Sequence, residues 1–313
     1  TATAYFPVRL APNAFPVRWE GVFVCAHHHG LSIKDLTRGS ITGHIVAMAI
    51  PMAAGMIFQT LYYFVDLYFV AQLGDAAIAG VSAAGNATFI VLALTQVLGV
   101  GTVALVSHAV GRKDQQDANL IFNQSLVIAA LCGALTLLAG YTLSELYVGS
   151  IAADEATVRA GTTYLYWFAP GMALQFAMIS MGSALRGTGI VKPTMVVQVV
   201  TLILNAVLAP VLIAGLGTGF AMGVAGAGLA STIAISVGVV LLSIYFVRLE
   251  KYVSFHAEQW QPRLDVWRRM LKIGLPAGGE FALIFVYVGI TYWVIRDFGA
   301  AAQAGFGIGS RVM

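Results

Sequence analysis

Five long stretches of this sequence contain no Asp, Glu, Lys or Arg. These charge-free stretches are residues 39–65, 76–111, 118–144, 160–185 and 193–247. A bilayer core of about 30 Å requires about 20 apolar helical residues, because a helix rises about 1.5 Å per residue. Each of the first four stretches therefore fits one membrane-spanning helix, and the fifth is long enough for two. The chain is 10% charged, against about 25% for soluble domains.

Further spans follow from the same pattern. The Gly-rich stretch 215–228 divides the fifth stretch, another span covers 270–298, and one more begins near Ala300. Membrane β-strands of about 10 residues with alternating polarity do not match runs this long and this uniformly apolar. The sequence thus predicts an all-α polytopic bundle with seven or eight spans.

The positions of Lys and Arg predict the orientation. With the N-terminus in the cytoplasm, only Arg159 and Arg296 fall on the outer side. We therefore expect a multi-pass protein of a bacterial plasma membrane, with the lipid bilayer as a partner and no nucleic acid. The cytoplasmic side then carries Arg112, Lys113, Arg186, Lys192, Arg248, Lys251, Arg263, Arg268, Arg269 and Lys272.

Metal, cofactor and enzyme functions find little support. Residues 1–38 lie outside the membrane pattern and include His27-His28-His29. We favour a chance cluster or a poorly ordered tail over a metal site there, because three adjacent His residues lack partners of defined geometry. The two cysteines imply neither a disulfide framework nor a Cys-based metal site. The sequence contains no HExxH, GxSxG or GxxxxGK[ST] motif, so we expect no enzyme, no metal and no cofactor.

An internal repeat relates the first span to the seventh. The ungapped alignment keeps a Pro and two Gly residues in register, which shared apolar character alone would not do. Both copies enter the membrane from the same side, as in secondary transporters built from two similar bundles. The matched pairs are Pro51 with Pro276, Gly74 with Gly299, Ala79 with Ala304 and Gly80 with Gly305.

The repeat predicts the domain organisation. We expect a complete six-helix N-terminal lobe over residues 39–248 and a cytoplasmic loop between lobes over 249–269. Residues 270–313 would then begin a second lobe with its first one or two helices. Because the second copy stops after little more than one span, we expect the chain to be truncated.

Asp66 is the first candidate for chemistry. A carboxylate at membrane depth costs about 2.5–3.5 kcal/mol, so it normally faces a cavity and has a function. Low dielectric raises its pKa, which suits a proton carrier or a cation ligand. The alternative is that Asp66 is solvated near the outer interface or caps a neighbouring helix. The repeat pairs it with Thr291, so the fold requires no charge there.

Other candidates are weighed against packing. Pro51 and Pro276 each remove a helix hydrogen bond and predict kinks. Glu280 lies one turn beyond Pro276 and either faces the bundle interior, reaches water or pairs with Lys272. Interhelical hydrogen bonds explain most of the polar residues within spans. These are Gln59, Asn86, Gln96, Asn123, Gln124, Gln175, Gln198 and Asn205.

We single out Asn205 among them, because Pro210 follows it and loosens the backbone nearby. An aromatic surface for organic cations is a further hypothesis, with core packing and interface anchoring as the alternative. Its members would be Tyr62, Tyr63, Tyr164, Tyr166, Trp167 and Phe168.

Over residues 39–313 the sequence resembles the multidrug and toxic compound extrusion (MATE) family. Four stretches in order carry the resemblance. They are 50–74, with Ile50-Pro51, Val65-Asp66 and Gln72-Leu73-Gly74; 185–195, with LRGTG and KPTM; 205–215; and 223–231, which ends at Ser231.

The resemblance implies twelve spans in two six-helix lobes. It also implies efflux of lipophilic, often cationic compounds in exchange for Na⁺ or H⁺, by a protein we expect to be a monomer. Asp66 matches the cation-coupling aspartate of the family, and Asn205 a polar residue of the same lobe. We expect Gln59, Tyr62 and Ser231 to line that lobe as well.

Two positions depart from the family pattern. Ala209 stands where many members have Asp, and Ile284 where some have Glu, with Glu280 one turn earlier. A lipid-linked-precursor flippase and an inactive fragment remain as alternatives. The flippase would be expected to have a more cationic cavity than the six-span lobe provides.

Overall fold

The computed structural model describes residues 68–309 apart from 218, 220 and 251, together with isolated positions between 42 and 64. All of these lie in one compact unit, Ile33–Met313. The described residues are almost entirely helical and contain no strand, as the charge-free stretches predict. The described positions between 42 and 64 are helical too, within the first predicted span.

Six of the described helices are long and apolar enough to cross a membrane. Together with the first span they confirm an all-α polytopic bundle. The short helix α5, which lies between the third and fourth predicted spans, was not expected. In chain order the elements are α3 (Asp75–Gly111), α4 (Gln115–Thr142), α5 (Ser144–Ile151), α6 (Glu155–Gly187), α7 (Lys192–Ala214), α8 (Val224–Arg248), η2 (Ala257–Gln259), α9 (Leu264–Ile295), η3 (Arg296–Phe298) and α10 (Ala300–Gly309).

Local chemistry sets where several helices begin and end. Asp114 caps α4 by accepting a hydrogen bond from the Asp117 backbone N–H at 3.0 Å. Asp154 caps α6 in the same way, accepting from the Thr157 N–H at 2.7 Å. Each cap satisfies a backbone donor that has no partner within its helix. Of the described spans, α4 and α6 thus begin at acidic caps.

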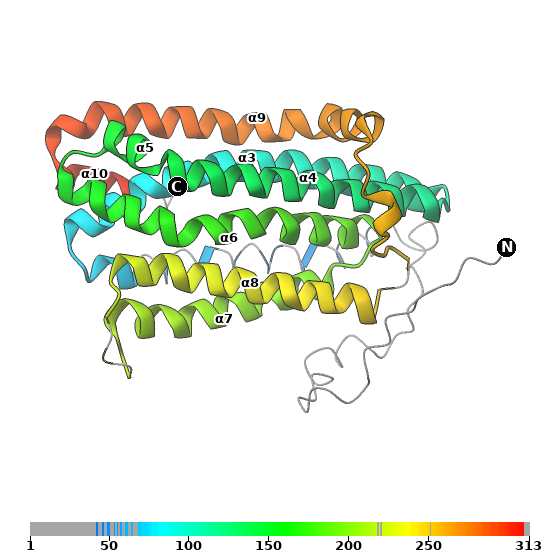
Figure 1. Ribbon diagram of the computed structural model, residues 1–313, viewed down its shortest axis with the longest axis horizontal. Coiled ribbons are helices and arrows are strands. Elements are labelled where there is room, and N and C mark those ends of the chain that lie inside the picture. Colours follow the sequence, from blue (N-terminus) through cyan, green and yellow to red (C-terminus); the bar gives the residue numbers. More distant parts are fainter. Residues whose placement is uncertain are drawn as a thin grey trace. The chain divides into compact units, whose positions relative to one another are not determined.

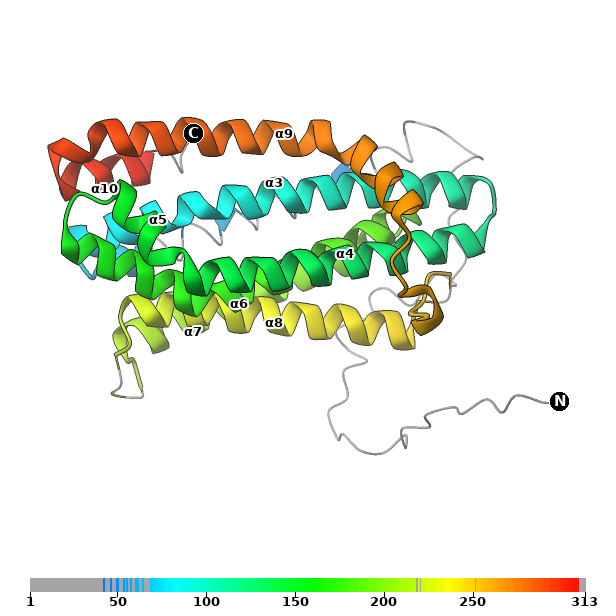
Figure 2. The ribbon, with the colours of Figure 1, turned by 45° about the horizontal axis from the view of Figure 1, so that its top comes forward.

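Helix α3 lies at the centre of the described bundle. It packs against α4, α6, α9 and α10, while α8 packs against both α6 and α7. Figures 1 and 2 show α9 running alongside α3, with α7 and α8 adjacent on the other side of α6. The connections alternate between two ends. The end with loops 112–114, 188–191 and 249–263 is called the basic end, and the other is called the opposite end.

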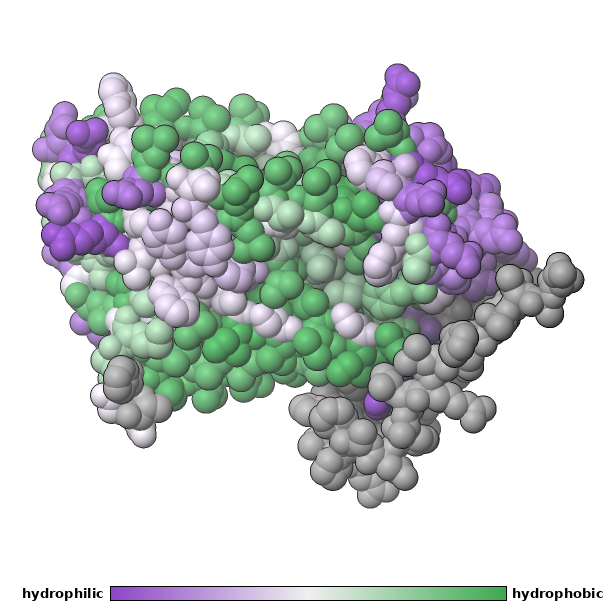
Figure 3. Space-filling model, in the orientation of Figure 1, coloured by the Kyte–Doolittle hydropathy of each residue, from purple (hydrophilic) through white to green (hydrophobic). Residues whose placement is uncertain are grey.

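The surface has the polarity expected of a membrane protein. In Figure 3, hydrophobic residues dominate the middle of the visible face, and hydrophilic residues gather at its two ends. Large apolar side chains on this surface include Leu283, 72% exposed, and Val247, 74% exposed. Such side chains are stable there only in contact with lipid or with further protein. The polar ends mark the limits of the membrane-spanning segments.

Helices α3 and α9 approach each other closely through glycine. A Cβ atom at Gly101 would lie 2.6 Å from the Met270 carbonyl oxygen. A Cβ atom at Gly274 would overlap the Val97 carbonyl group, and one at Gly278 the Val97 side chain. Small residues let membrane helices pack backbone against backbone, where lipid provides no hydrophobic force for association. This contact joins the predicted first lobe to the first helix of the predicted second.

The internal repeat has a counterpart in backbone conformation. Gly74 precedes α3 with φ 102° and ψ 173°, and Gly299 precedes α10 with φ 86° and ψ 176°. Only glycine adopts this region readily. The two helices that follow also contact each other through matched positions, since Ala79 and Ala304 share one buried cluster. Equivalent segments of the two copies therefore meet at the opposite end.

The predicted kink position in the second copy lies inside a helix. Pro276 falls within α9, which continues through it to Ile295. Figure 2 shows the axis of α9 changing direction along its length, as expected where a proline removes a helix hydrogen bond. Pro51, its partner in the first copy, lies outside the described residues.

The α3–α9 contact leads to a stability prediction. Gly274→Ala should lower the free energy of unfolding by about 1–3 kcal/mol, the usual cost of overpacking, because its methyl group would displace the Val97 backbone. The control is Gly279→Ala on the same helix, where an added Cβ atom meets nothing within 4 Å. Thermal unfolding in detergent should show a lower melting temperature for Gly274→Ala alone. Equal melting temperatures would contradict the close contact.

Candidate functional site

An apolar pocket of about 750 Å³ opens between three segments of the bundle. One wall comes from the first predicted span, one from α7 and one from α10. The pocket is an open groove, since Tyr68 is 65% exposed and Leu61 46% exposed, and its volume lies within the range of about 300–1,000 Å³ for small-molecule sites. The described residues of the lining are uncharged: Leu61, Phe64, Tyr68, Phe69, Ala71, Ala206 and Ile308.

Asn205, which directly precedes the pocket residue Ala206 in the chain, belongs to a buried polar pair. The Asn205 side-chain amide of α7 donates a hydrogen bond to the Ser231 hydroxyl of α8 at 3.2 Å. Asn205 is 0% exposed and Ser231 is 1% exposed. The helices come this close because Gly226 of α8 lies against the Leu212 backbone of α7. The structure therefore brings together two residues that the sequence predicted for the lobe lining.

The remaining predicted lining residues of the first span cannot be placed. Asp66, Gln59 and Tyr62 lie outside the described residues. A described neighbour, Gly55, contacts the Gln198 side chain of α7. The first span thus packs against the helix that carries Asn205.

Glu280 and its surroundings are described. Its side chain is exposed, whereas Gly274 and Gly278 on the same helix face α3. No ion pair joins Glu280 to Lys272 among the described residues. Glu280 is therefore placed on a face of α9 that the described bundle leaves uncovered.

The predicted aromatic surface divides into separate pairs. Tyr164 and Phe168 are buried together with ring centroids 5.3 Å apart. Tyr166 stacks on Tyr141 at 5.8 Å, and Trp167 is 43% exposed. These rings do not line the apolar pocket. Within the described residues the prediction thus identified packing and surface aromatics, and it missed the ring-bearing residues of the pocket.

The connection between α8 and α9 is bound to α4 by carboxamide side chains. The Asn123 side-chain oxygen accepts hydrogen bonds from the His256 backbone N–H at 2.9 Å and the Trp260 indole N–H at 3.1 Å. The Gln124 oxygen accepts from the Arg263 backbone N–H at 2.9 Å and the Trp267 indole N–H at 2.8 Å. Their amide groups in turn donate to carbonyl oxygens of this loop.

Asn119 extends this arrangement by one turn. Its oxygen accepts from the Ser254 N–H at 2.8 Å, and its amide donates to the Tyr252 carbonyl at 3.2 Å. Three neighbouring carboxamides thus supply the hydrogen bonds that an irregular loop cannot make with itself. The residues of the loop behave as part of the lobe that contains α4.

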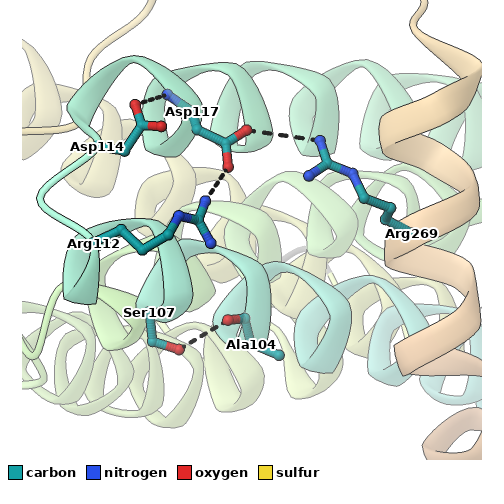
Figure 4. A network of polar contacts seen from close by, with 6 residues as sticks. All are labelled: Ala104, Ser107, Arg112, Asp114, Asp117 and Arg269. Atoms are coloured by element: carbon teal, nitrogen blue, oxygen red, sulfur yellow. Dashed lines mark hydrogen bonds and ion pairs between the residues drawn. The ribbon is translucent and has the colours of Figure 1, made fainter.

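An ion-pair network extends the same connection to α9 (Figure 4). The Asp117 carboxylate lies 2.7 Å from Arg112 and 3.7 Å from Arg269. Both arginine side chains are well exposed, so screening by water limits each pair to at most about 1 kcal/mol. The network fixes position more than it adds stability, and it places the start of α9 beside the turn between α3 and α4.

Two tyrosines at the ends of the bundle have shifted pKa values. Burial raises the pKa of the Tyr147 phenol on α5 well above its usual range. Tyr147 therefore stays neutral and accepts a hydrogen bond from the Asn86 side chain at 3.0 Å. Burial, and then the negative charge of Asp114, raises the pKa of Tyr252 in the loop. Neither phenol is a proton carrier near neutral pH.

Comparison with known proteins identifies the chain. The fold defines a polytopic membrane protein of close-packed helices. The sequence model of the MatE family matches residues 51–211, and the chain belongs to this family.

Relatives with names extend the comparison. "Probable multidrug resistance protein YpnP" of Bacillus subtilis (strain 168) is 28% identical over 284 residues, which cover 89% of this chain and 61% of the relative. "Multidrug export protein MepA" of Staphylococcus aureus (strain MRSA252) is 25% identical over 273 residues, covering 85% and 58%. The chain thus spans about 60% of the length of the curated relatives it matches.

Solved structures share the fold. A crystal structure of MATE in the straight conformation superposes with a TM-score of 0.77 at 25% identity, covering 90% of this chain and 62% of that one. The inward-facing conformation of a multidrug resistance MATE family transporter of the MOP superfamily gives a TM-score of 0.71 at 24% identity, covering 85% and 61%. The membrane-protein reading of the charge-free stretches is therefore confirmed.

The hydrogen bonds from Asn119, Asn123 and Gln124 of α4 to the loop 252–263, called the carboxamide clamp, lead to a prediction for hydrogen exchange. Asn123→Ala should lower the protection of backbone amides in 252–263 by about tenfold or more, because the His256 amide loses its acceptor. Amides within α6 and α8 should keep their protection. Gln116→Ala, at an exposed position of the same helix, is the matched control and should leave the loop unchanged. Unaltered exchange in Asn123→Ala would show that the carboxamide clamp does not protect the backbone amides of the loop.

Proposed function

We propose that the protein exports lipophilic, often cationic organic compounds across the membrane in exchange for Na⁺ or H⁺. The observation that carries the proposal is the pocket between the first span, α7 and α10, whose described lining residues are uncharged. Such a pocket suits amphiphilic compounds of varied shape, since apolar contact makes few geometric demands. In this proposal the two lobes alternate in exposing the pocket to either side.

The coupling site in the proposal is Asp66, and Asn205 and Ser231 are buried polar residues of the same lobe. Protonation of Asp66, or Na⁺ binding to it, would compete with the substrate and bias the equilibrium between conformations. The pair of Asn205 and Ser231 supports this role, because neutral polar groups orient a carboxylate or an ion without adding a charge.

Topology and domain limits belong to the same proposal. The lobe would span 39–248, the connection 249–269 and the start of the second lobe 270–313. The basic end would face the cytoplasm of a bacterial cell, with the N-terminus on that side and residues 1–38 outside the membrane core. The names of the two relatives describe multidrug resistance and multidrug export, and they support organic compounds as the substrate class.

Pocket chemistry also separates this proposal from a lipid-precursor flippase. A diphosphate headgroup requires cationic or multiple hydrogen-bonding partners. The described lining offers apolar and aromatic side chains with one phenol, that of Tyr68. Export of lipophilic compounds fits this lining better.

The role of Asp66 is tested by Asp66→Asn in the complete gene product. Ion-coupled efflux from cells or proteoliposomes should fall by about tenfold or more, because the variant has no group to titrate or to bind the ion. Asp75→Asn, an exposed carboxylate in the first turn of α3, is the control and should transport normally. Separate H⁺ and Na⁺ gradients identify the ion. Full coupled transport in Asp66→Asn would refute the assignment.

The pocket is tested by filling it. Ala206→Trp places an indole in the pocket and should reduce export of bulky compounds by about fivefold or more, the scale of losing one good apolar contact surface. Val207→Trp, at a neighbouring position that is 58% exposed, should leave export unchanged. Drug susceptibility and vesicle efflux both measure the effect. Equal behaviour of the two variants would place the substrate elsewhere.

A further inference from the structure

Gln303 of α10 makes three hydrogen bonds while it is completely buried. Its amide donates to the Ile151 carbonyl at 2.6 Å and to the Tyr292 carbonyl at 3.3 Å. Its oxygen accepts from the Ala153 backbone N–H at 3.1 Å. The side chain is 0% exposed. A single carboxamide thus satisfies backbone groups from two different parts of the fold.

Two of these bonds cross from one copy of the repeat to the other. Ile151 ends α5, and Ala153 lies in the turn between α5 and α6, both within the first six spans. Gln303 follows Gly299 in the second copy, where Ile78 is its counterpart in the first. The link therefore has no equivalent at the matched position of α3, since Ile78 has no hydrogen-bonding side chain.

The contact between copies next to Gln303 combines an apolar cluster, formed by Ile78, Ala79 and Ala304, with buried polar groups. The Ser82 hydroxyl of α3 lies against Gly307 of α10. Neither this hydroxyl nor the Asn86 side-chain oxygen one turn further has a hydrogen-bond partner among the described residues, although both residues are buried. Buried polar atoms without partners cost free energy, and water would satisfy them if the helices separated. These two atoms therefore oppose closure of the seam, as we call the contact of α3 with α9 and α10.

The basic end of the same seam is held differently. There Gly101 and Gly274 bring α3 and α9 into backbone contact, and the carboxamides of Asn123 and Gln124 bind the loop before α9. Backbone packing and many hydrogen bonds secure that end. At the opposite end, two of the three bonds of Gln303 hold α10 to the connection between α5 and α6, and the third joins it to α9.

We propose that Gln303 is a latch that keeps the opposite end of the seam between the two repeat copies closed. When α10 moves away from α5 and α6, the bonds to Ile151 and Ala153 break and water enters beside Ser82 and Asn86. The inference rests on the proposed transport function for its purpose, since a transporter must open and close this end in each cycle. The contacts that define the latch do not depend on that function.

Thiol labelling tests the latch without measuring transport. The complete protein carries Cys25→Ser and Cys132→Ser, and Ser82→Cys is the reporter between α3 and α10. A charged maleimide is added to the protein in nanodiscs, where both ends are accessible. Gln303→Met keeps the size of the side chain and removes its hydrogen bonds. Labelling of the reporter should become about fivefold to tenfold faster, the population change made by one or two net hydrogen bonds.

Two comparisons make the result specific. Gln124→Met removes the same chemistry at the basic end and should not accelerate labelling of the reporter. Ser150→Cys, at an exposed position of α5, normalises the reactivity of the reagent. Gln303→Glu is a second variant, in which a carboxylate faces the Ile151 and Tyr292 carbonyls, and it should also accelerate labelling.

An unchanged rate in Gln303→Met and Gln303→Glu would overturn the latch. An equal acceleration in Gln124→Met would overturn it too, because general loosening would then explain the effect. Failure of the proposed transport function has a different signature, namely absence of coupled efflux from the unmodified protein. Labelling and efflux therefore report on the two proposals separately.

Discussion

The structure depends on the backbone contact that glycine allows between helices in the membrane. Lipid tails are as apolar as leucine, so burying leucine between helices provides little drive for association there. Close packing provides it instead, and α3 shows the effect most clearly. Its Gly101 lies on Met270 of α9, and its Gly80 lies on Gly161 of α6, with little space for a methyl group at either contact. The central position of α3 follows from these small residues.

Polar side chains bind the backbone groups of irregular segments, which helix packing leaves without partners. Irregular segments have backbone groups without partners, and carboxamides supply both a donor and an acceptor in one side chain. Asn119, Asn123 and Gln124 serve the loop at the basic end, and Gln303 serves the turn after α5 at the opposite end. None of these carboxamides carries a charge, so each can be buried without the cost of desolvating an ion.

The spans could be predicted from the sequence because charge is excluded from lipid over a fixed length. That single physical limit defines α3, α4, α6, α7 and α8 to within about five residues, whereas α9, which carries Lys272 and Glu280, begins six residues before the predicted 270. Helix α5 was missed because its eight residues are too few to span the bilayer, and span length was the signal used. The pairing of Gly74 with Gly299 was visible in the sequence, and the two backbone conformations agree with it.

Partners across the chain were harder to predict than spans. Asn123 and Gln124 looked like interhelical hydrogen-bonding residues. Gln124 does accept a bond from Trp267 of α9, but both mainly bind a loop that follows more than a hundred residues later. Nothing local in a sequence indicates such a partner. Asn205 was singled out because Pro210 follows it, and Ser231 through resemblance, but their contact became visible only in the structure. The pocket was missed for the same reason, since its walls come from three distant segments.

The contact between α3 and α10 has a form usually found between separate molecules. Matched positions meet there, with Ala79 beside Ala304 and Ser82 beside Gly307. In a two-fold homodimer each residue near the axis faces its own copy, so the interface must be complementary to itself. Here a single chain reproduces that condition with two diverged copies. Enlarging a residue on one side therefore requires shrinking its counterpart, as the serine opposite a glycine illustrates.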